Sequence, residues 1–344
     1  MDNFIKLSKT EYKNLFDKVL FKTFFHGIEW QDFLEKEFKW LKFEHYLYKD
    51  ELLLTFARFK VLGKEKSISL PFCEYGGPLP LKKNINFQDF NKEVLEEFKN
   101  IKIKFHPAIL RFLKVEFSEV EPPKNIGGST SVASVASAVS THWIENLNRT
   151  TEQDLFASFR KTLRHSIRNA EEKKLEIKKC SNLKELKQFY KLYSANLKRK
   201  KTVPYPFSIF KFLFDSPDAE ILLAIYKNKI IAGDLFVHYD KFVHYFFSAS
   251  DYKYRNLGPS YLILWKKLKS LCGQDKIFDL GAAPKNSELE IFKKGWRGKE
   301  YPILQIGIKR SEESLRSSKL RNIWGLLPGF IIRKFSPFLI KYRL

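Results

Sequence analysis

Apolar and polar positions alternate along this chain in blocks that predict a succession of strands and amphipathic helices. In the second half, Phe242 to Ser250 predicts a strand, Asp251 to Gly258 a polar loop, and Pro259 to Cys272 a helix. Apolar residues of that helix recur at i, i+3 and i+4, which predicts a buried stripe of Tyr261, Leu264, Trp265, Leu268 and Leu271. A short apolar strand from Lys276 to Leu280 follows, and then a second helix that ends in FKKGW, residues 292–296.

The first half of the chain has the same kinds of block. Residues 1–40 predict helices. Strands of a meander are then predicted over Phe43 to Tyr48, Glu51 to Phe59 and Lys66 to Leu70. A loop with two glycines, PFCEYGGPL over residues 71–79, and a helix around Phe87 to Asn100 precede a further strand. Because hairpin, loop, helix and strand recur in the second half, we expect two copies of one α/β fold.

The repeat sets the expected division of the chain. We expect a first domain over residues 1–126, a second over residues 142–313, and a tail over residues 314–344. Residues 127–141 join the domains and consist almost entirely of Gly, Ser, Thr, Ala and Val. That composition is typical of a flexible linker, and an ordered strand of small residues is the alternative.

The hairpin of the second half is predicted to turn at residues 240–241, which fixes the side chains that share a face. Strict alternation puts His238 and His244 on opposite faces, and this argues against a metal site built from both. The same alternation puts Tyr245 on the His238 face and Ser248 on the His244 face.

A basic helix is predicted to begin at Thr150 or Thr151 and to continue through FRKTLRHSIRNAEEK. Four of its cations lie along one stripe: Arg160, Lys161, Arg164 and Arg168. Like charges repel along such a stripe unless an anion lies between them, so Arg164 and Arg168 are candidates for substrate binding. A solvated helix face is the alternative.

The loop between the predicted strand and helix carries RNLGPS, residues 255–260. A loop at a helix N-terminus offers free N–H groups and the positive end of the helix dipole to a phosphate. This strand, R-x-x-G-x-small loop and helix resemble the acyl-donor segment of the GNAT acyltransferase superfamily. Arg255 and Gly258 match its loop, whereas Pro259 lacks an N–H and Ser260 stands where Gly or Ala is usual. The resemblance implies that Arg255, Gly258 and Ser260 bind the donor.

Over most of residues 150–308 the chain resembles the FemAB branch of that superfamily. The likeness is carried by YFFSASDYKYRNLGPSYLILWKKLKSL, by FDLG over residues 278–281 and by FKKGW, and less clearly by PFCEYGGPL. FemAB-type proteins transfer an aminoacyl group from charged tRNA to the amine of a peptidoglycan precursor, and more distant relatives are regarded as acyltransferases of envelope or polysaccharide pathways. The resemblance implies tandem GNAT-like domains with mixed sheets in an α/β fold.

The resemblance also supplies candidate site residues. Phe292 and Lys293 match a Phe-Lys pair at the substrate cleft of the family, where a lysine can neutralise a developing oxyanion. An exposed helical lysine is the alternative for Lys293. Arg199 precedes TVPYP and Tyr205 lies within it, in the region that lines the acceptor cleft of the family. Tyr245 on the hairpin is a further candidate for substrate binding. No serine or cysteine triad is evident, and the general base stays unassigned.

Charge adds a partner class to this picture. The net charge of +23, from 62 basic and 39 acidic residues, favours an anionic partner such as nucleic acid, anionic lipid or a phosphorylated substrate. A lysine-rich composition with solvated faces is the alternative. The 344 residues suit two domains, and 44% hydrophobic residues can form two cores. Three widely spaced cysteines predict neither disulfides nor zinc, and they fit a reducing cytoplasm.

The last thirty residues are basic and apolar. From Ser314 to Leu344 there is no acidic residue, and basic positions alternate with bulky apolar ones. This pattern is typical of helices that lie on an anionic bilayer, with a helix packed on the protein core as the alternative. Pro328 and Pro337 are expected to break the segment into short pieces. No signal peptide and no apolar run long enough to span a bilayer are evident.

Together these patterns predict a cytoplasmic enzyme, peripheral at the inner face of the plasma membrane, that moves an aminoacyl or acyl group onto an amine of a lipid-linked or nucleotide-linked envelope precursor. Aminoacyl-tRNA or acyl-CoA is the expected donor substrate, with no tightly bound cofactor and no metal. One alternative is an acyl-CoA-dependent N- or O-acyltransferase that acts in exopolysaccharide or lipid-linked sugar biosynthesis. The other is a non-catalytic scaffold that binds RNA or lipid.

Overall fold

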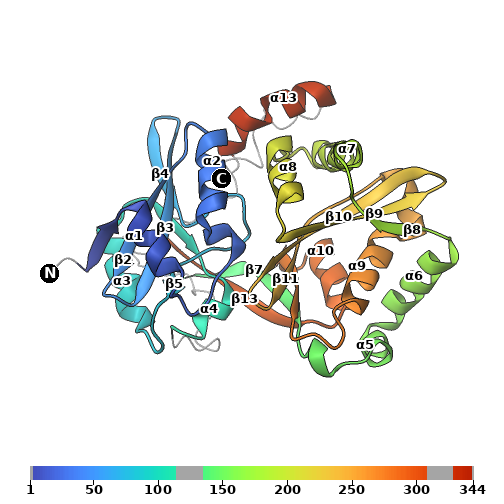
Figure 1. Cartoon of the computed structure of the whole chain (residues 1–344), viewed down its shortest axis with the longest axis horizontal. Helices are drawn as coiled ribbons and strands as arrows, with labels where there is room; N and C mark the ends of the chain where they lie inside the picture. The colour runs from blue at the N-terminus through green and yellow to red at the C-terminus, as the bar shows by residue number, and fades with distance from the viewer. Residues whose placement is uncertain (1–2, 114–134, 308–327, 343–344) are drawn as a thin grey trace. The chain divides into compact units, whose positions relative to one another are not determined.

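The structure, a computed structural model, describes residues 3–113, 135–307 and 328–342 (Figure 1). It divides into two compact units. The first consists of Met1–Thr141, Ala282–Lys285 and Glu300–Arg310, and the second of His142–Gly281, Asn286–Lys299 and Ser311–Leu344. Parts of the predicted linker and tail, residues 127–134 and 314–327, lie outside the described residues.

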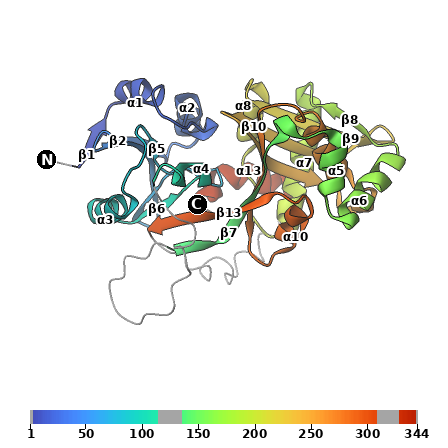
Figure 2. The ribbon, with the colours of Figure 1, turned by 90° about the horizontal axis from the view of Figure 1, so that it is seen from below.

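The first unit is a mixed sheet with helices on both faces. Its strands follow the order β1-β2-β3-β4-β6-β13, with β5 paired to β3, and β4 and β6 are parallel neighbours. Helices α1 and α2 lie on one side of these strands and α3 on the other (Figure 2). The elements are β1 (Phe4–Leu7), α1 (Lys9–Phe16), η1 (Phe24–His26), α2 (Ile28–Glu37), β2 (Lys42–Tyr48), β3 (Leu52–Val61), β4 (Lys64–Ile68), β5 (Leu79–Pro80), α3 (Phe87–Glu97), β6 (Ile101–Lys104), α4 (Pro107–Leu110) and β13 (Lys299–Gly307).

The second unit repeats this plan. Its strands follow the order β12-β11-β10-β9-β8, and only β11 and β12 of these neighbours are parallel. Helices α7 and α8 cover one face of the sheet, and α6 and α9 cover the other (Figure 1). The elements are η3 (Leu147–Arg149), α5 (Glu152–Ser158), α6 (Lys161–Glu172), β8 (Glu176–Lys179), α7 (Leu183–Arg199), α8 (Phe207–Asp215), β9 (Ala219–Tyr226), β10 (Lys229–Tyr239), β11 (Phe242–Ser250), η4 (Tyr252–Leu257), α9 (Pro259–Lys269), β12 (Ile277–Pro284), α10 (Glu288–Gly295), α13 (Gly329–Leu339) and η5 (Ile340–Tyr342).

The predicted repeat is confirmed by the order and direction of the strands. In the first unit the hairpin β3–β4 is followed by α3 and by β6, which is parallel to β4. In the second unit the hairpin β10–β11 is followed by α9 and by β12, which is parallel to β11. A helix that connects two parallel neighbours must cross over the sheet, so each unit carries one such crossover.

The core of the second unit forms where α9 crosses the sheet. The predicted stripe of α9 is buried at Leu264, Trp265, Leu268 and Leu271, and Tyr261 is half-buried beside it. The ring of Phe159 lies 5.8 Å from that of Trp265 and 5.2 Å from that of Trp296. Aromatic contacts at these distances stabilise the core beyond their burial alone.

Three local predictions are wrong. Residues 4–7 form a strand paired with β2, whereas helices were expected throughout residues 1–40. The basic helix is interrupted, because Phe159 adopts an extended conformation that buries its ring in the aromatic core, and α6 begins only at Lys161. Pro337 does not break the tail but lies inside α13, where one lost N–H near the end of the helix is tolerated.

The strand β7 (Val135–Ile144) takes up the second part of the small-residue segment, as the alternative interpretation has it. Its residues fall in both units. Small side chains do not distinguish a linker from a strand, because the hydrogen bonds of a strand depend on its neighbours in the sheet.

The close packing of β10 against α7 gives a stability prediction at Gly233. A Cβ atom there would lie 2.5 Å from Cδ2 of Phe189 and 2.9 Å from Cδ2 of Leu223. We expect Gly233→Ala to lower the free energy of unfolding by about 1–3 kcal/mol, since the buried neighbours must shift. Urea unfolding followed by tryptophan fluorescence measures this.

Gly295→Ala is the matched control. Its Cβ would meet only Leu163, at 3.8 Å or more, so stability should stay within about 0.5 kcal/mol of the wild type. Equal effects of the two substitutions would contradict the packing described for β10.

Candidate functional site

The loop that precedes α9 is held against α6 by Gly258. This residue has φ +67°, and a Cβ atom on it would lie 3.2 Å from Cβ of Ala170 and 3.4 Å from the Ser166 carbonyl oxygen. Glycine is therefore needed here for both its backbone conformation and the close approach to α6. This contact between Gly258 and α6 fixes the position of the start of α9, which includes Ser260.

The same loop lies beside α10. The ring of Tyr261, next to Ser260, lies 5.4 Å from the ring of Phe292. Helix α9 has no side-chain cap, and Pro259 at its first turn supplies no N–H. A phosphate at this end of the helix would thus meet fewer backbone donors than a helix N-terminus usually offers.

Lys293 is buried, in contrast to the exposed helical lysine of the alternative interpretation. Its exposed fraction is 3%, and it follows Phe292 in the last turn of α10. Its charge lies close enough to His244 to lower the pKa of that imidazole. The next residue, Lys294, is bound differently, with Nζ 2.8 Å from Glu290 Oε1.

His244 and Asp279 form a buried pair where β11 and β12 meet. The distance from His244 Nδ1 to Asp279 Oδ2 is 2.8 Å, and both side chains are fully buried. Burial and the charge of Lys293 lower the pKa of His244 to about 3, so the neutral ring donates its Nδ1–H to the carboxylate. The Gly281 N–H donates to the other oxygen of Asp279 at 2.8 Å.

This pair marks the place where the two parallel strands part. Among the described residues, β11 pairs with β12 only from Phe242 to His244, opposite Ile277 to Asp279. Strand β11 then continues to Ser250 alongside β10. A substrate group can approach backbone between strands that diverge, and the buried charge of Lys293 lies next to this position.

Arg199 and Arg255 come together on a single exposed tyrosine. Their guanidinium carbons lie 4.3 Å and 3.8 Å from the centre of the Tyr252 ring. Neither guanidinium forms an ion pair within the described chain, so both keep donors available for an anion.

Arg164 and Arg168 are engaged at the corner between α5 and α6. Arg164 Nη1 donates to the Ala157 carbonyl at 2.6 Å, and the Arg168 guanidinium lies 5.3 Å from the centre of the Phe156 ring. Arg168 also lines a cavity of about 250 Å³ with Glu171 and Trp265, among others. Both arginines thus stabilise the junction of α5 and α6. Their role in substrate binding stays a prediction.

Tyr205 and Tyr245 contact different neighbours. The ring of Tyr205 lies 5.3 Å from that of Phe247, and Tyr245 donates its hydroxyl to Asp234 Oδ1 at 3.3 Å. Sequence reasoning missed Asp234, which is fully buried in β10. A single aspartate in an apolar strand was the available signal.

The predicted face of Ser248 is wrong because β11 contains a bulge. Leu235 pairs with Phe247 but Phe236 pairs with Tyr245, so Phe246 is an extra residue. Alternation shifts by one position across the bulge. Ser248 therefore lies opposite Asp234, on the same face as Tyr245.

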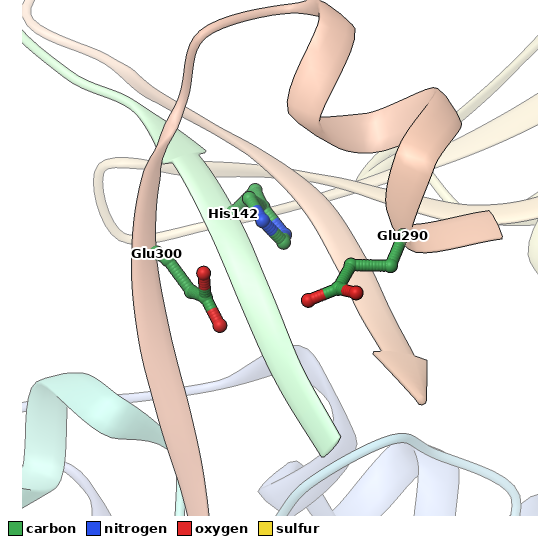
Figure 3. A group of neighbouring side chains, drawn as sticks. All are labelled: His142, Glu290 and Glu300. Atoms are coloured by element: carbon green, nitrogen blue, oxygen red, sulfur yellow. The ribbon is translucent and has the colours of Figure 1, made fainter. Parts of the chain in front are cut away.

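Figure 3 shows a further group, in which the side chains of His142, Glu290 and Glu300 point toward one another. One ligand atom of each lies within 4.8 Å of the others, a set that can hold a divalent cation. Glu290 already accepts from Lys294 and from the Asn286 N–H, which accounts for its burial. We assign no function to this group.

Comparison with known proteins agrees with the fold. Residues 157–294 match the family described as an acetyltransferase (GNAT) domain. The structure is similar to FemX, with a TM-score of 0.58 at 14% sequence identity over 88% of this chain and 96% of that chain. It is also similar to L-PGS from Bacillus licheniformis, with a TM-score of 0.52 at 11% identity over 94% of this chain and 98% of that chain.

A conserved protein of unknown function from Bacteroides thetaiotaomicron shares the fold as well, with a TM-score of 0.52 at 10% identity over 89% of this chain and 98% of that one. No curated protein sequence matches the chain. The matched family segment contains every element from α6 to α10 that builds the site described above. Residues 157–294 therefore form an acyltransferase domain of the GNAT type, and the likeness to FemX and L-PGS shows a shared fold.

Proposed function

We propose that this acyltransferase moves an aminoacyl or acyl group from an activated ester or thioester to an amine of a cell-envelope precursor at the cytoplasmic face of the membrane. The observation that carries the proposal is the buried Lys293 next to the place where β11 and β12 part. A lysine at this place has one evident chemical use. Attack of the amine turns the carbonyl oxygen into an oxyanion, and a fixed cation in a site of low dielectric stabilises that charge far better than water does.

The step needs little else from the protein. A neutral amine attacks the carbonyl carbon, the C–N bond forms as the C–O or C–S bond breaks, and one proton leaves the nitrogen. Orientation of donor and acceptor supplies much of the rate enhancement. Phe292 contacts Tyr261 at the start of α9 and directly precedes Lys293 in α10. The end of the predicted donor loop and the cation are therefore close to each other.

The Arg199–Tyr252–Arg255 stack supports a phosphate-bearing donor. Two guanidinium groups without an ion pair in the described part of the chain contact one ring, from the end of α7 and from η4. Arginine donors match phosphate oxygens, and an exposed stack of this kind can follow a nucleic-acid backbone. Because Pro259 weakens the cradle for a pyrophosphate, we favour aminoacyl-tRNA over acyl-CoA as the donor.

The membrane location is inferred from α13. One side of this helix is buried at Ile332 and Ser336 and contacts α7. The other side exposes three phenylalanines, by 65%, 48% and 67%: Phe330, Phe335 and Phe338. Arg333 and Lys334 lie among them. Exposed aromatic residues beside cations, in a segment without acidic residues, fit an anionic bilayer surface.

The helices of the described residues include none with the length and apolar character needed to span a bilayer. Contact through α13 would hold the site near a lipid-linked acceptor. An acyl-CoA-dependent transferase of sugar precursors and a silent RNA- or lipid-binding scaffold are the competing functions, and the following assay separates them.

Purified protein with charged tRNA and a lipid-linked amine acceptor should form the acylated product, and Lys293→Met should lower kcat by about 10²–10³-fold, since the oxyanion loses its cation. Product formation from radiolabelled aminoacyl-tRNA measures this. Lys266→Met, an exposed lysine of α9, is the control and should stay within about threefold.

The alternatives predict other results in that assay. Product from acyl-CoA alone would support the second function, and tRNA or lipid binding without product from either donor would support the scaffold. If the wild type is active and Lys293→Met has the same kcat as Lys266→Met, Lys293 does not take part in the mechanism.

Arg199→Ala and Arg255→Ala should each raise KM for the donor about tenfold, a loss of about 1.4 kcal/mol, with kcat little changed. The stack contacts the part of the donor that does not react, so binding and not chemistry is weakened. Initial rates at varied donor concentration measure both constants. Arg149→Ala removes an exposed arginine elsewhere in the unit and should leave both unchanged, whereas equal effects of all three would indicate general charge alone.

Replacement of Phe330, Phe335 and Phe338 by Ser should abolish sedimentation with vesicles that contain phosphatidylglycerol, because the apolar contact with the bilayer is lost. Wild-type protein should bind these vesicles and not vesicles of phosphatidylcholine. The control variant carries Ser at the exposed Ile5 and Leu62 of the first unit. Undiminished sedimentation of the triple variant would exclude α13 as the membrane contact.

A further inference from the structure

Asp234 is a buried carboxyl whose hydrogen bonds are incomplete. Its exposed fraction is 0%, and Tyr245 donates to Oδ1 at 3.3 Å. Among the described residues, Oδ2 has no hydrogen-bond partner. Buried carboxylate oxygens are rarely left without a donor, because the lost hydration is not replaced. An oxygen buried without a donor suggests that Asp234 has a function besides its structural one.

Ser248 connects this carboxyl to the surface. The bulge at Phe246 brings Ser248 directly opposite Asp234 in the antiparallel pairing of β10 and β11. Its hydroxyl lies close enough to lower the pKa values of both Asp234 and Tyr245. Ser248 itself is exposed, whereas Asp234 and Tyr245 are buried. One hydroxyl thus separates the buried carboxyl from solvent.

Ser248, the exposed end of this route, lies seven residues before the predicted donor loop in the sequence. Ser248 lies on the part of β11 that has no described pairing with β12, after His244. Asp251, three residues further on, caps η4, which leads to Gly258 and α9. A group bound between the loop and the parting strands would therefore approach β11 near Ser248.

No formal charge besides Asp234 itself belongs to this cluster. Leu222 is its partner in β9, and the pKa of Asp234 responds to burial, to Ser248 and to Tyr245. The buried cation of α9, Lys267, is paired with Glu220 and lies beside His238. Burial raises the pKa of Asp234 from 3.8 to about 7, against the opposing effects of the two hydroxyls. The group can thus gain and lose a proton near neutral pH.

We propose that Asp234 accepts, through Ser248, the proton that the acceptor amine loses during transfer. As the C–N bond forms, the nitrogen gives its proton to Ser248 Oγ while Ser248 passes its own proton to Oδ2 of Asp234. The proton returns by the same route to the departing oxygen or sulfur, or to water. Tyr245 is a positioning residue that holds Oδ1 and leaves Oδ2 toward Ser248. This inference rests on the proposed function and assigns the base of that reaction, which would act from the face of β11 opposite to His244.

The test compares Asp234→Asn and Ser248→Ala with Asp240→Asn. Asp240 is exposed at the turn of the same hairpin, at φ 47°, a conformation that Asn tolerates. The acceptor is acetohydrazide, whose terminal amine stays uncharged across the assay range, so a change of rate with pH does not come from protonation of the acceptor. Transfer from the active donor is measured between pH 5 and 9.

The wild-type kcat should rise as pH passes about 7, because the ionised form of Asp234 is the acceptor of the proton. Asp234→Asn should lower kcat by about 10²-fold or more at pH 8 and remove the rise, and the donor KM should not change. Ser248→Ala should show a similar loss although its side chain is exposed and its fold is not at risk. Asp240→Asn should match the wild type.

A second measurement keeps the result independent of folding defects. Carbon-13 NMR of labelled aspartate should find one carboxyl, absent from Asp234→Asn, that titrates near pH 7 in the resting protein. A carboxyl that stays ionised at pH 5, or protonated at pH 9, would overturn the inference.

The failures are distinguishable. If the wild type transfers the acyl group and Asp234→Asn retains kcat and the same pH profile, the inference is wrong and the proposed function stands. If the wild type is inactive with charged tRNA and with acyl-CoA, the proposed function fails and the inference fails with it.

Discussion

The site depends on the buried hydrogen bond between His244 and Asp279, which joins β11 to β12 at the last residue pair they share. Asp279 also accepts from the Gly281 N–H, so the carboxylate is held by two donors at the point where β12 turns away. A carboxylate without exposure is stable only if such donors replace its hydration. Lys293 adds a nearby positive charge, which favours the neutral imidazole of His244.

The cation of Lys293 and the carboxylate of Asp279 both lie near His244, in a protein interior of low dielectric constant. Lys293, His244 and Asp279 are all buried, and they come from α10, β11 and β12. In the proposed function, substrate enters where the strands part beyond this cluster. Phe292 and Trp296, on either side of Lys293 in the sequence, hold α10 in place through contacts with Tyr261 and Phe159. Packing thus fixes the position of the cation, as preorganised stabilisation of an oxyanion requires.

Much of the fold could be predicted from periodicity and turn chemistry. The two-residue turn at Asp240 and Lys241, the pairing of His238 with Val243, the cap at Thr151 and the buried stripe of α9 all follow from local pattern, and the structure has each of them. The local conformations that the sequence did not predict are determined by contacts between residues far apart in the chain. Phe159 ends α5 because its ring enters a core formed by Trp265 and Trp296, more than a hundred residues further on.

The candidate site divides in the same way. Arg255, Gly258 and Lys293 were identified by a motif, and Arg199 by its position at the end of a helix, but only the structure brings Arg199 and Arg255 onto Tyr252. The pairing of Ser248 with Asp234 was missed because the bulge at Phe246 reverses the faces of β11, and a bulge has no signature in the alternation of apolar and polar residues. Without it, Ser248 would point away from Asp234, and the cluster would not exist.

The central claim is that acyl transfer takes place where β11 and β12 part, beside Lys293. A crystal structure of the full chain with a stable amide analogue of an aminoacylated tRNA end tests this most directly. The account predicts that the acyl carbonyl lies between the two strands, with its oxygen toward the ammonium group of Lys293. An analogue whose carbonyl binds at another place, with Lys293 still enclosed by protein, would contradict it.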